Sequence, residues 1–155
     1  MNNNLNISHE KFMELAVDQA KLSALEMEVP VGAIVLHKNK VIASGRNRRE
    51  KLNNSLYHAE IEAINKACLN LKSWRLLECT IYITLEPCPM CAGAIINSRI
   101  PSLVYGAKDY KSGCCGSVIN LFEFPFNHKP EIISGVLEQK CSRLLSNFFK
   151  NLRRL

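Results

Sequence analysis

The chain has 155 residues, of which 47% are apolar, so it is long enough for one ordinary domain with a sizeable core. Its 20 lysine and arginine residues outnumber its 14 aspartate and glutamate residues, and the net charge of +6 suits either a polyanionic partner or simple solubility. No run reaches the roughly 18 uninterrupted apolar residues of a membrane span, and the asparagine-rich start lacks the features of a secretion signal, so we expect a cytoplasmic protein without membrane association.

The hydrophobic pattern predicts alternating helices and strands. Ser8 can cap a first helix that runs to about Met27, and a turn at Lys38-Asn39 joins the first two strands. The expected strands cover residues 31–36, 41–44, 80–85, 103–107 and 131–136. Further helices are expected over 58–71, from Pro89 onward and from 137 to the end of the chain, with room for a short helix before the last strand.

This order of elements predicts a central mixed sheet of five strands covered by helices on both faces, a three-layer α/β/α fold. The first two strands are expected to form an antiparallel hairpin. The later strands are joined through helices and are expected to be mainly parallel. The sequence contains no repeat, linker or low-complexity tract, which indicates one domain over residues 1–155.

Seven cysteines are many for this length, and an odd number cannot all pair within the chain. Secreted disulfide scaffolds are usually shorter and have an even number. We therefore expect a reducing compartment in which some thiolates bind a metal. Cys68, Cys79 and Cys141 are expected to be buried as small hydrophobes, and a structural role is also the expectation for Cys114-Cys115.

Two segments carry metal-binding residues: His58-Ala59-Glu60 and Pro87-Cys88-Pro89-Met90-Cys91. Each begins a predicted helix, where free N–H groups and the positive end of the helix dipole favour thiolates. The first helical turn brings the two sulfurs of Cys-x-x-Cys together. Two thiolates with one neutral imidazole suit zinc better than other metals.

Three protein ligands are typical of a catalytic zinc site, because structural sites are normally closed by four. Cys114 or Cys115 remains an alternative fourth ligand that would make the site structural. Cys-x-x-Cys alone also occurs in redox pairs, and His-x-Glu alone is a weak signal. Together and in this order they match the signature of zinc-dependent nucleobase deaminases.

Glu60 follows His58 too closely to bind the same ion easily. Its carboxylate can instead take a proton from the attacking water and return it to a ring nitrogen and then to the leaving amine. A glutamate that only complements the helix dipole is the alternative.

Longer stretches of the sequence closely resemble the bacterial tRNA-specific adenosine deaminases, over about residues 8–149. The matching runs are Val29-Pro30-Val31-Gly32-Ala33, Gly45 to Arg48, His58-Ala59-Glu60-Ile61, Thr84-Leu85-Glu86-Pro87-Cys88, Cys91-Ala92-Gly93-Ala94, Ser98-Arg99-Ile100 and Gly106-Ala107-Lys108-Asp109. The resemblance implies a cytidine-deaminase-like fold, one zinc per subunit, and conversion of the wobble adenosine of a tRNA anticodon to inosine. It also implies a homodimer with active sites near the subunit interface.

The same resemblance implies residues that contact the RNA. It makes Asn47 a contact to the flipped base or its ribose and Asp109 a contact to the substrate backbone and sugar. Of Phe148 and Phe149, which also match the family, one is expected to pack and the other, Phe149, to face RNA; two core residues at a helix bend are the alternative. The positions that line the RNA groove are Lys111, Ser112, Asn127 and His128. A basic face on the last helix suits phosphate contact or is simply solvated, and its members are Lys140, Arg143, Lys150, Arg153 and Arg154.

Two pairs of residues depart from the family pattern. Leu56-Tyr57 stands where the family usually has Thr-Ala, in a loop that borders the pocket. The family pattern therefore does not predict the fine shape of the base site at that point. Cys114-Cys115 stands where small residues such as alanine are usual.

Two other functions share parts of this pattern. A deaminase of a free base or mononucleotide, such as cytosine or guanine, would have the same zinc site. A noncatalytic RNA-binding protein with structural zinc would share the metal ligands and the positive charge. The charge and the positions of Asn47, Asp109 and Asn127 favour the RNA deaminase.

Overall fold

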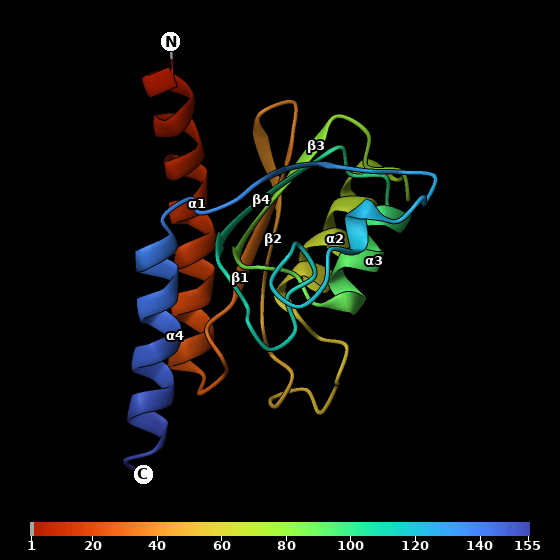
Figure 1. The fold of residues 1–155 in the computed structure, drawn as a ribbon. Helices are drawn as coiled ribbons and strands as arrows, with labels where there is room; N and C mark the ends of the chain where they lie inside the picture. The colour runs from red at the N-terminus through yellow and green to blue at the C-terminus, as the bar shows by residue number, and fades with distance from the viewer. Residues whose placement is uncertain (1) are drawn as a thin grey trace.

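The computed structural model describes the backbone of residues 2–155 and the side chains of residues 9–155 (Figure 1). Its helices are α1 (Asn2–Leu25), α2 (Ala59–Leu71), α3 (Pro89–Asn97) and α4 (Glu138–Leu152), with a 3₁₀ turn, η1 (Leu121–Glu123). Its strands are β1 (Gly32–His37), β2 (Lys40–Arg46), β3 (Cys79–Leu85), β4 (Ser102–Ala107) and β5 (Glu131–Ile133).

The five strands form one mixed sheet in the order β2-β1-β3-β4-β5. β1 pairs antiparallel with both β2 and β3, while β3, β4 and β5 run parallel. Lys38 and Asn39 both have positive φ, as a tight hairpin turn between β1 and β2 requires. The predicted five-stranded sheet, hairpin and parallel half are thus confirmed.

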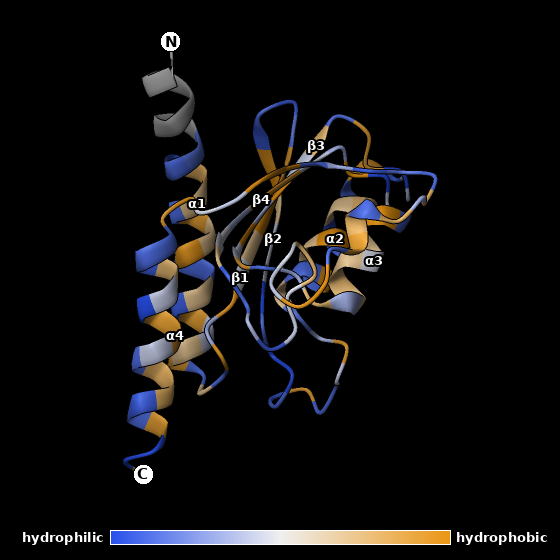
Figure 2. Cartoon of the chain, viewed as in Figure 1, coloured by the Kyte–Doolittle hydropathy of each residue, from blue (hydrophilic) through white to orange (hydrophobic). Residues whose placement is uncertain are grey.

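Helices cover both faces of the sheet, as the sequence predicts. α1 and α4 lie side by side on one face, and α2 and α3 lie on the other (Figure 1). Apolar residues gather on the strands and on α2 and α3, whereas α1 and α4 alternate between polar and apolar surface (Figure 2). One core cluster, which includes Ile81 and Ile95, lies on the α2–α3 side, and a second, which includes Met13 and Val104, lies under α1 and α4.

The start of α1 and the end of β5 differ from the predictions. α1 begins at Asn2, so Ser8 lies inside the helix; the side chain of Ser8 lies outside the described ones. β5 ends at Ile133, because the chain turns through Gly135 and Leu137, both with positive φ, before α4 begins. The short helix for which the sequence leaves room before the last strand is the three-residue η1, between β4 and β5.

The seven cysteines all have free thiols. Cys79 and Cys141 are buried, as predicted, whereas Cys68 is only partly covered. No helix within residues 2–155 combines the length and apolar character that a transmembrane segment requires.

Two glycines in neighbouring strands let the helices approach the sheet at backbone distance. A Cβ on Gly32 would lie 2.0 Å from the carbonyl oxygen of Ala16 in α1. A Cβ on Gly45 would lie 2.2 Å from the carbonyl oxygen of Ala59, in the first turn of α2. Because that turn follows His58 and contains Glu60, Gly45 fixes the position of both side chains relative to the sheet.

We expect Gly45→Ala to push the first turn of α2 away from β2 and so to weaken both folding and zinc binding. Overpacking of this kind costs about 1–3 kcal/mol, measurable as a lower midpoint of denaturant unfolding and a weaker zinc affinity in competition with a chelator. Gly93→Ala is the control, because a Cβ there meets nothing within 4 Å. A zinc affinity equal to wild type in Gly45→Ala would contradict the proposed link between Gly45 and the metal ligands.

Candidate active site

His58 and Cys88 each occupy the position just before a helix. Both have extended backbone conformations, with φ and ψ of −79° and 157° for His58 and −74° and 174° for Cys88, so neither belongs to the helix that follows it. Pro89 takes the first helical position of α3, where it loses no hydrogen bond. Cys91 lies within the first turn of α3 and is buried. The N-termini of α2 and α3 therefore bring these three side chains together.

The distances between the three ligand atoms fit one tetrahedral zinc ion. His58 Nδ1 lies 3.7 Å from Cys88 Sγ and 3.6 Å from Cys91 Sγ, and all three atoms lie within 4.8 Å of one another. Zinc bonds of about 2.0–2.3 Å at tetrahedral angles require ligand atoms about 3.6 Å apart. The donor set and its spacing thus fit the expected metal.

The site has three protein ligands and no fourth among the described residues. Among the described His, Cys, Asp and Glu side chains, only His58, Cys88 and Cys91 lie close enough together, as a group of three or more, to hold one metal ion. Cys114 instead donates its thiol hydrogen to the carbonyl oxygen of Ser112, at 3.6 Å. The alternative in which Cys114 or Cys115 closes a structural site is therefore not supported.

The two cysteines differ in acidity. A hydrogen bond from the Cys91 thiol lowers the pKa of Cys88 to about 4, with a further contribution from His58. The same hydrogen bond, together with burial, holds the pKa of Cys91 above its usual range. Cys88 is therefore a thiolate at neutral pH, and metal binding would release the proton of Cys91.

Glu60 is buried beside the ligands, with only 3% of its surface exposed. Burial raises the pKa of its carboxyl to about 7. Its Oε2 atom has no hydrogen-bond partner, although it is fully buried. A buried carboxylate oxygen left without a partner is rare and suggests a site reserved for a ligand.

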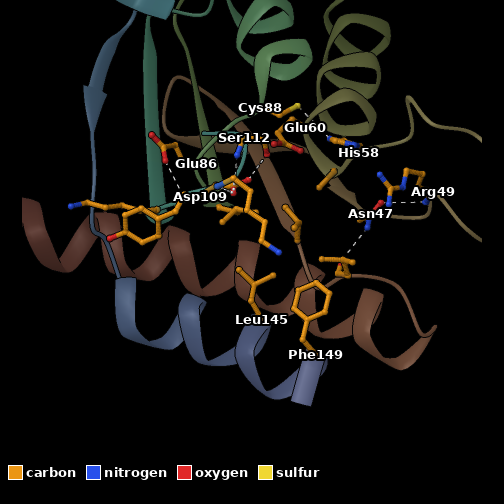
Figure 3. Close-up of a pocket in the computed structure, with 17 residues that line it drawn as sticks. Asn47, Arg49, His58, Glu60, Glu86, Cys88, Asp109, Ser112, Leu145 and Phe149 are labelled. Atoms are coloured by element: carbon orange, nitrogen blue, oxygen red, sulfur yellow. Dashed lines mark hydrogen bonds between the residues drawn. The ribbon is translucent and has the colours of Figure 1, made fainter. Parts of the chain in front are cut away.

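These residues form one wall of a cavity of about 550 Å³, within the size range of small-molecule sites. His58, Glu60 and Cys88 gather on one side, and Leu145 and Phe149 project from α4 on the other (Figure 3). The remaining lining residues are Val29, Val31, Asn47, Arg49, Ala59, Leu85, Glu86, Lys108, Asp109, Tyr110, Lys111 and Ser112.

Asn47 lines the cavity, as expected, in a fixed orientation. Its Nδ2 donates to the carbonyl oxygen of Val29 at 3.2 Å, and its Oδ1 accepts from the backbone N–H of Arg49 at 3.2 Å. The amide is thus held between the segment before β1 and the loop after β2.

Asp109 lines the cavity in a loop that its own carboxylate organises. Oδ1 accepts from the backbone N–H groups of Lys111 and Ser112 at 3.0 and 3.2 Å, and Oδ2 accepts from the Ser112 hydroxyl at 2.6 Å. Each carboxylate oxygen has about two acceptor sites, so a position on Oδ2 remains for a substrate hydroxyl.

Not every residue expected from the sequence reaches the cavity. Asn127 and His128 are absent from its lining, and His128 Nε2 lies 2.7 Å from the carbonyl oxygen of Ile100. Their contact with RNA stays a prediction. Tyr57 also lies outside the lining: the guanidinium of Arg48 is 5.2 Å from its ring centre and donates to its hydroxyl at 3.3 Å.

Sequence reasoning missed several lining residues. Arg49 and Lys108 join Lys111 as cations around the cavity, and Leu145 adds an apolar contact from α4. Glu86 lies in one of the runs that match the family, which by itself gives it no role. Its place directly after a buried strand was a usable signal, because a carboxylate there must find hydrogen-bond donors.

Comparison with known proteins identifies a family for the chain. A family model described as MafB19-like deaminase matches residues 7–153. The tRNA-specific adenosine deaminase of Bacillus subtilis (strain 168) is 47% identical over 146 residues, which cover 94% of this chain and 91% of the relative. The protein of the same name from Rickettsia felis is 45% identical over 144 residues, covering 91% of this chain and 100% of the relative.

Solved structures agree with these sequence matches. A structure from a study of A-to-I editing by tRNA:A34 deaminases has a TM-score of 0.85 at 42% identity, covering 87% of this chain and 99% of that chain. The guanine deaminase of Bacillus subtilis has a TM-score of 0.63 at 26% identity, covering 95% and 94%. With its zinc-ligand triangle and its cytidine-deaminase-like fold, the chain belongs to the family of tRNA-specific adenosine deaminases.

Proposed function

We propose that this protein hydrolyses adenosine to inosine at position 34, the wobble position of a tRNA anticodon. The observation that carries the proposal is the triangle of His58, Cys88 and Cys91 with the unpartnered carboxylate of Glu60 beside it. The names of its relatives, which are tRNA-specific adenosine deaminases at 43–47% identity, support the choice of substrate.

His58, Cys88 and Cys91 would hold one zinc ion per subunit. When bound, zinc acts as a Lewis acid and lowers the pKa of a coordinated water toward roughly 7. Three protein ligands leave room for that chemistry, whereas a fourth would block it.

Glu60 moves the protons. Water adds to C6 of adenosine and ammonia leaves, so one proton must reach the ring nitrogen and another must reach the departing amine. A single carboxylate, buried against the ligands and free at Oε2, can carry both protons in turn: the first from the attacking water to the ring nitrogen, and the second from the new C6 hydroxyl to the amine as the C–N bond breaks.

The cavity walls suit a nucleotide that has been flipped out of its stack. Asn47 presents an oriented amide for the base or ribose, and Phe149 provides an aromatic surface on the opposite side. The rim of the cavity, which would face the sugar and the RNA backbone, is formed by Asp109, Lys111 and Ser112. Positive charge for the phosphates comes also from Arg49 and Lys108. Asn127 and His128 would contact RNA farther from the base.

We further propose that the protein acts as a cytoplasmic homodimer. Phe124 and Phe126, whose ring centres are 6.3 Å apart, are both about half exposed, as is Trp74, so apolar surface is present for a second copy. Light scattering on the purified protein tests this stoichiometry.

The experiment that tests the function is incubation with total tRNA followed by sequencing for adenosine-to-inosine change. We expect inosine at wobble positions. An anticodon stem-loop, free adenosine, guanine and cytosine form the comparison set. Free substrates turned over at rates equal to the stem-loop would favour a small-molecule deaminase, and inosine in none of them would favour a noncatalytic RNA-binding protein with structural zinc.

Glu60→Ala should retain zinc and lose deamination by at least about 10²-fold, the usual contribution of a general acid–base residue. Zinc content is measured by elemental analysis, and activity by inosine release from the stem-loop. The control is Asp18→Ala, an exposed position on α1 that should leave both unchanged. Undiminished activity in Glu60→Ala would remove Glu60 from the mechanism.

Asp109→Asn should alter RNA affinity or the preference for RNA over DNA. The amide oxygen can still accept from the N–H groups of Lys111 and Ser112, so the loop keeps its turn, while the negative charge near the proposed sugar contact is lost. Titrations with matched RNA and DNA stem-loops measure the effect. If both affinities and their ratio equal those of wild type, the proposed sugar contact is wrong.

A further inference from the structure

Glu86 is a buried carboxylate that the proposed reaction does not use. It directly follows β3 and stands two residues before the zinc ligand Cys88. Only 1% of its surface is exposed. Across from it lies the segment of residues 109–117 after β4, which we call the rim loop because Asp109, Lys111 and Ser112 line the cavity.

The carboxylate of Glu86 accepts hydrogen bonds from both ends of the rim loop. Oε2 accepts from the backbone N–H of Asp109 at 2.9 Å (Figure 3). Oε1 accepts from the backbone N–H groups of Cys115 and Ser117 at 3.0 and 3.2 Å. One side chain thus accepts from three partly buried main-chain N–H groups.

The backbone next to Glu86 continues this attachment. The N–H of Glu86 donates to the carbonyl oxygen of Ala107 at 2.8 Å, and the N–H of Cys114 donates to the carbonyl oxygen of Pro87 at 2.9 Å. The rim loop is therefore bonded to the same short segment that supplies Cys88.

We propose that Glu86 is a positioning residue of the deaminase: by binding both ends of the rim loop, it fixes the substrate-contacting side chains at a set distance from the zinc ligands. This inference rests on the proposed function for its consequence in catalysis. Both oxygens of Glu86 are engaged, unlike Oε2 of Glu60, so its role is to hold the loop and not to move protons.

A substitution at Gly113 should disturb the contact between Glu86 and the rim loop without changing Glu86 itself. A Cβ on Gly113 would lie 2.1 Å from Glu86 Oε2 and 2.5 Å from the carbonyl oxygen of Asp109. A methyl group there must displace the carboxylate or the start of the rim loop. Gly113→Ala should therefore reproduce the effect of changing Glu86.

Glu86→Gln should affect the two ends of the rim loop differently. An amide has one acceptor oxygen, and its NH₂ group would face a main-chain N–H at the other end. One end of the rim loop then stays bound and the other is released. The side chain keeps its size, so the surrounding packing is preserved.

The test compares full-length, zinc-loaded Glu86→Gln and Gly113→Ala with wild type. Amide hydrogen exchange of residues 109–117 should be faster in both variants. KM for an anticodon stem-loop should rise about tenfold, as expected for contacts worth one hydrogen bond. Zinc content should stay at one per subunit and kcat should stay close to wild type, because the start of α2 holds His58 and Glu60 and the start of α3 holds Cys88 and Cys91.

Two controls separate positioning from general loss of stability. Ile34→Val removes a methyl group from the core under α1, on the other face of the sheet, and should lower the unfolding temperature without raising KM. Gly93→Ala adds a methyl group in open space and should match wild type throughout.

The proposal is overturned if the rim-loop amides exchange at the wild-type rate in both variants, or if they exchange faster while KM is unchanged. A loss of zinc with a parallel fall in kcat also overturns it, because Glu86 would then act on the metal site. If wild type does not deaminate tRNA, the proposed function fails, and hydrogen exchange still decides whether Glu86 holds the rim loop.

Discussion

Two helix N-termini, those of α2 and α3, converge on one point, and the rest of the site depends on that convergence. Each brings unpaired N–H groups and the positive end of a dipole, so the point favours negative charge. The thiolate of Cys88 supplies this negative charge. When a metal binds, Cys91 loses its proton and becomes a second thiolate. The sheet fixes the geometry: β3 runs directly into the Cys88 segment, and Gly45 lets α2 approach β2 closely enough to bring His58 to the same place. A shift of either helix would separate the imidazole from the sulfurs.

Four glutamates are buried in this protein, and their hydrogen bonds divide them into two kinds. Glu28 accepts from the N–H groups of residues 50 and 51 at 3.2 and 2.6 Å, and Glu86 accepts from the rim loop. Burial by itself would raise the pKa of Glu62, but the N–H of Arg46 and the ammonium of Lys66 outweigh it and the pKa lies below its usual value. These three carboxylates tie loops or strand ends in place. Glu60 alone among the four keeps a buried oxygen without a partner, which distinguishes a chemical role from a structural one.

Local spacing accounts for what the sequence could predict. The periodicity of apolar residues located every strand and helix of the core. The Cys-x-x-Cys spacing located Cys88 and Cys91, because one helical turn brings them together, and the His-x-Glu motif at the start of another helix marked His58 as their partner. What it could not locate depends on contacts between distant segments. Leu145 reaches the cavity only because α4 packs beside α1, and His128 is held away from it by a hydrogen bond to Ile100. The early end of β5 likewise follows from backbone turns at Gly135 and Leu137, where leucine gives no local signal.

The way in which Glu86 holds the rim loop has a consequence for sequence variation. Its three partners are main-chain N–H groups, which every residue except proline possesses. Most side chains of the loop can therefore be exchanged without loosening its attachment. Three positions are restricted: any side chain at 113 meets the carboxylate, Gly116 has a φ of +124° that other residues rarely adopt, and the Asp109 carboxylate holds the turn. A library that varies Tyr110, Lys111 and Ser112 while keeping Glu86, Asp109, Gly113 and Gly116 would alter substrate preference on an unchanged scaffold, which makes the loop a natural place for new specificities to evolve or be selected.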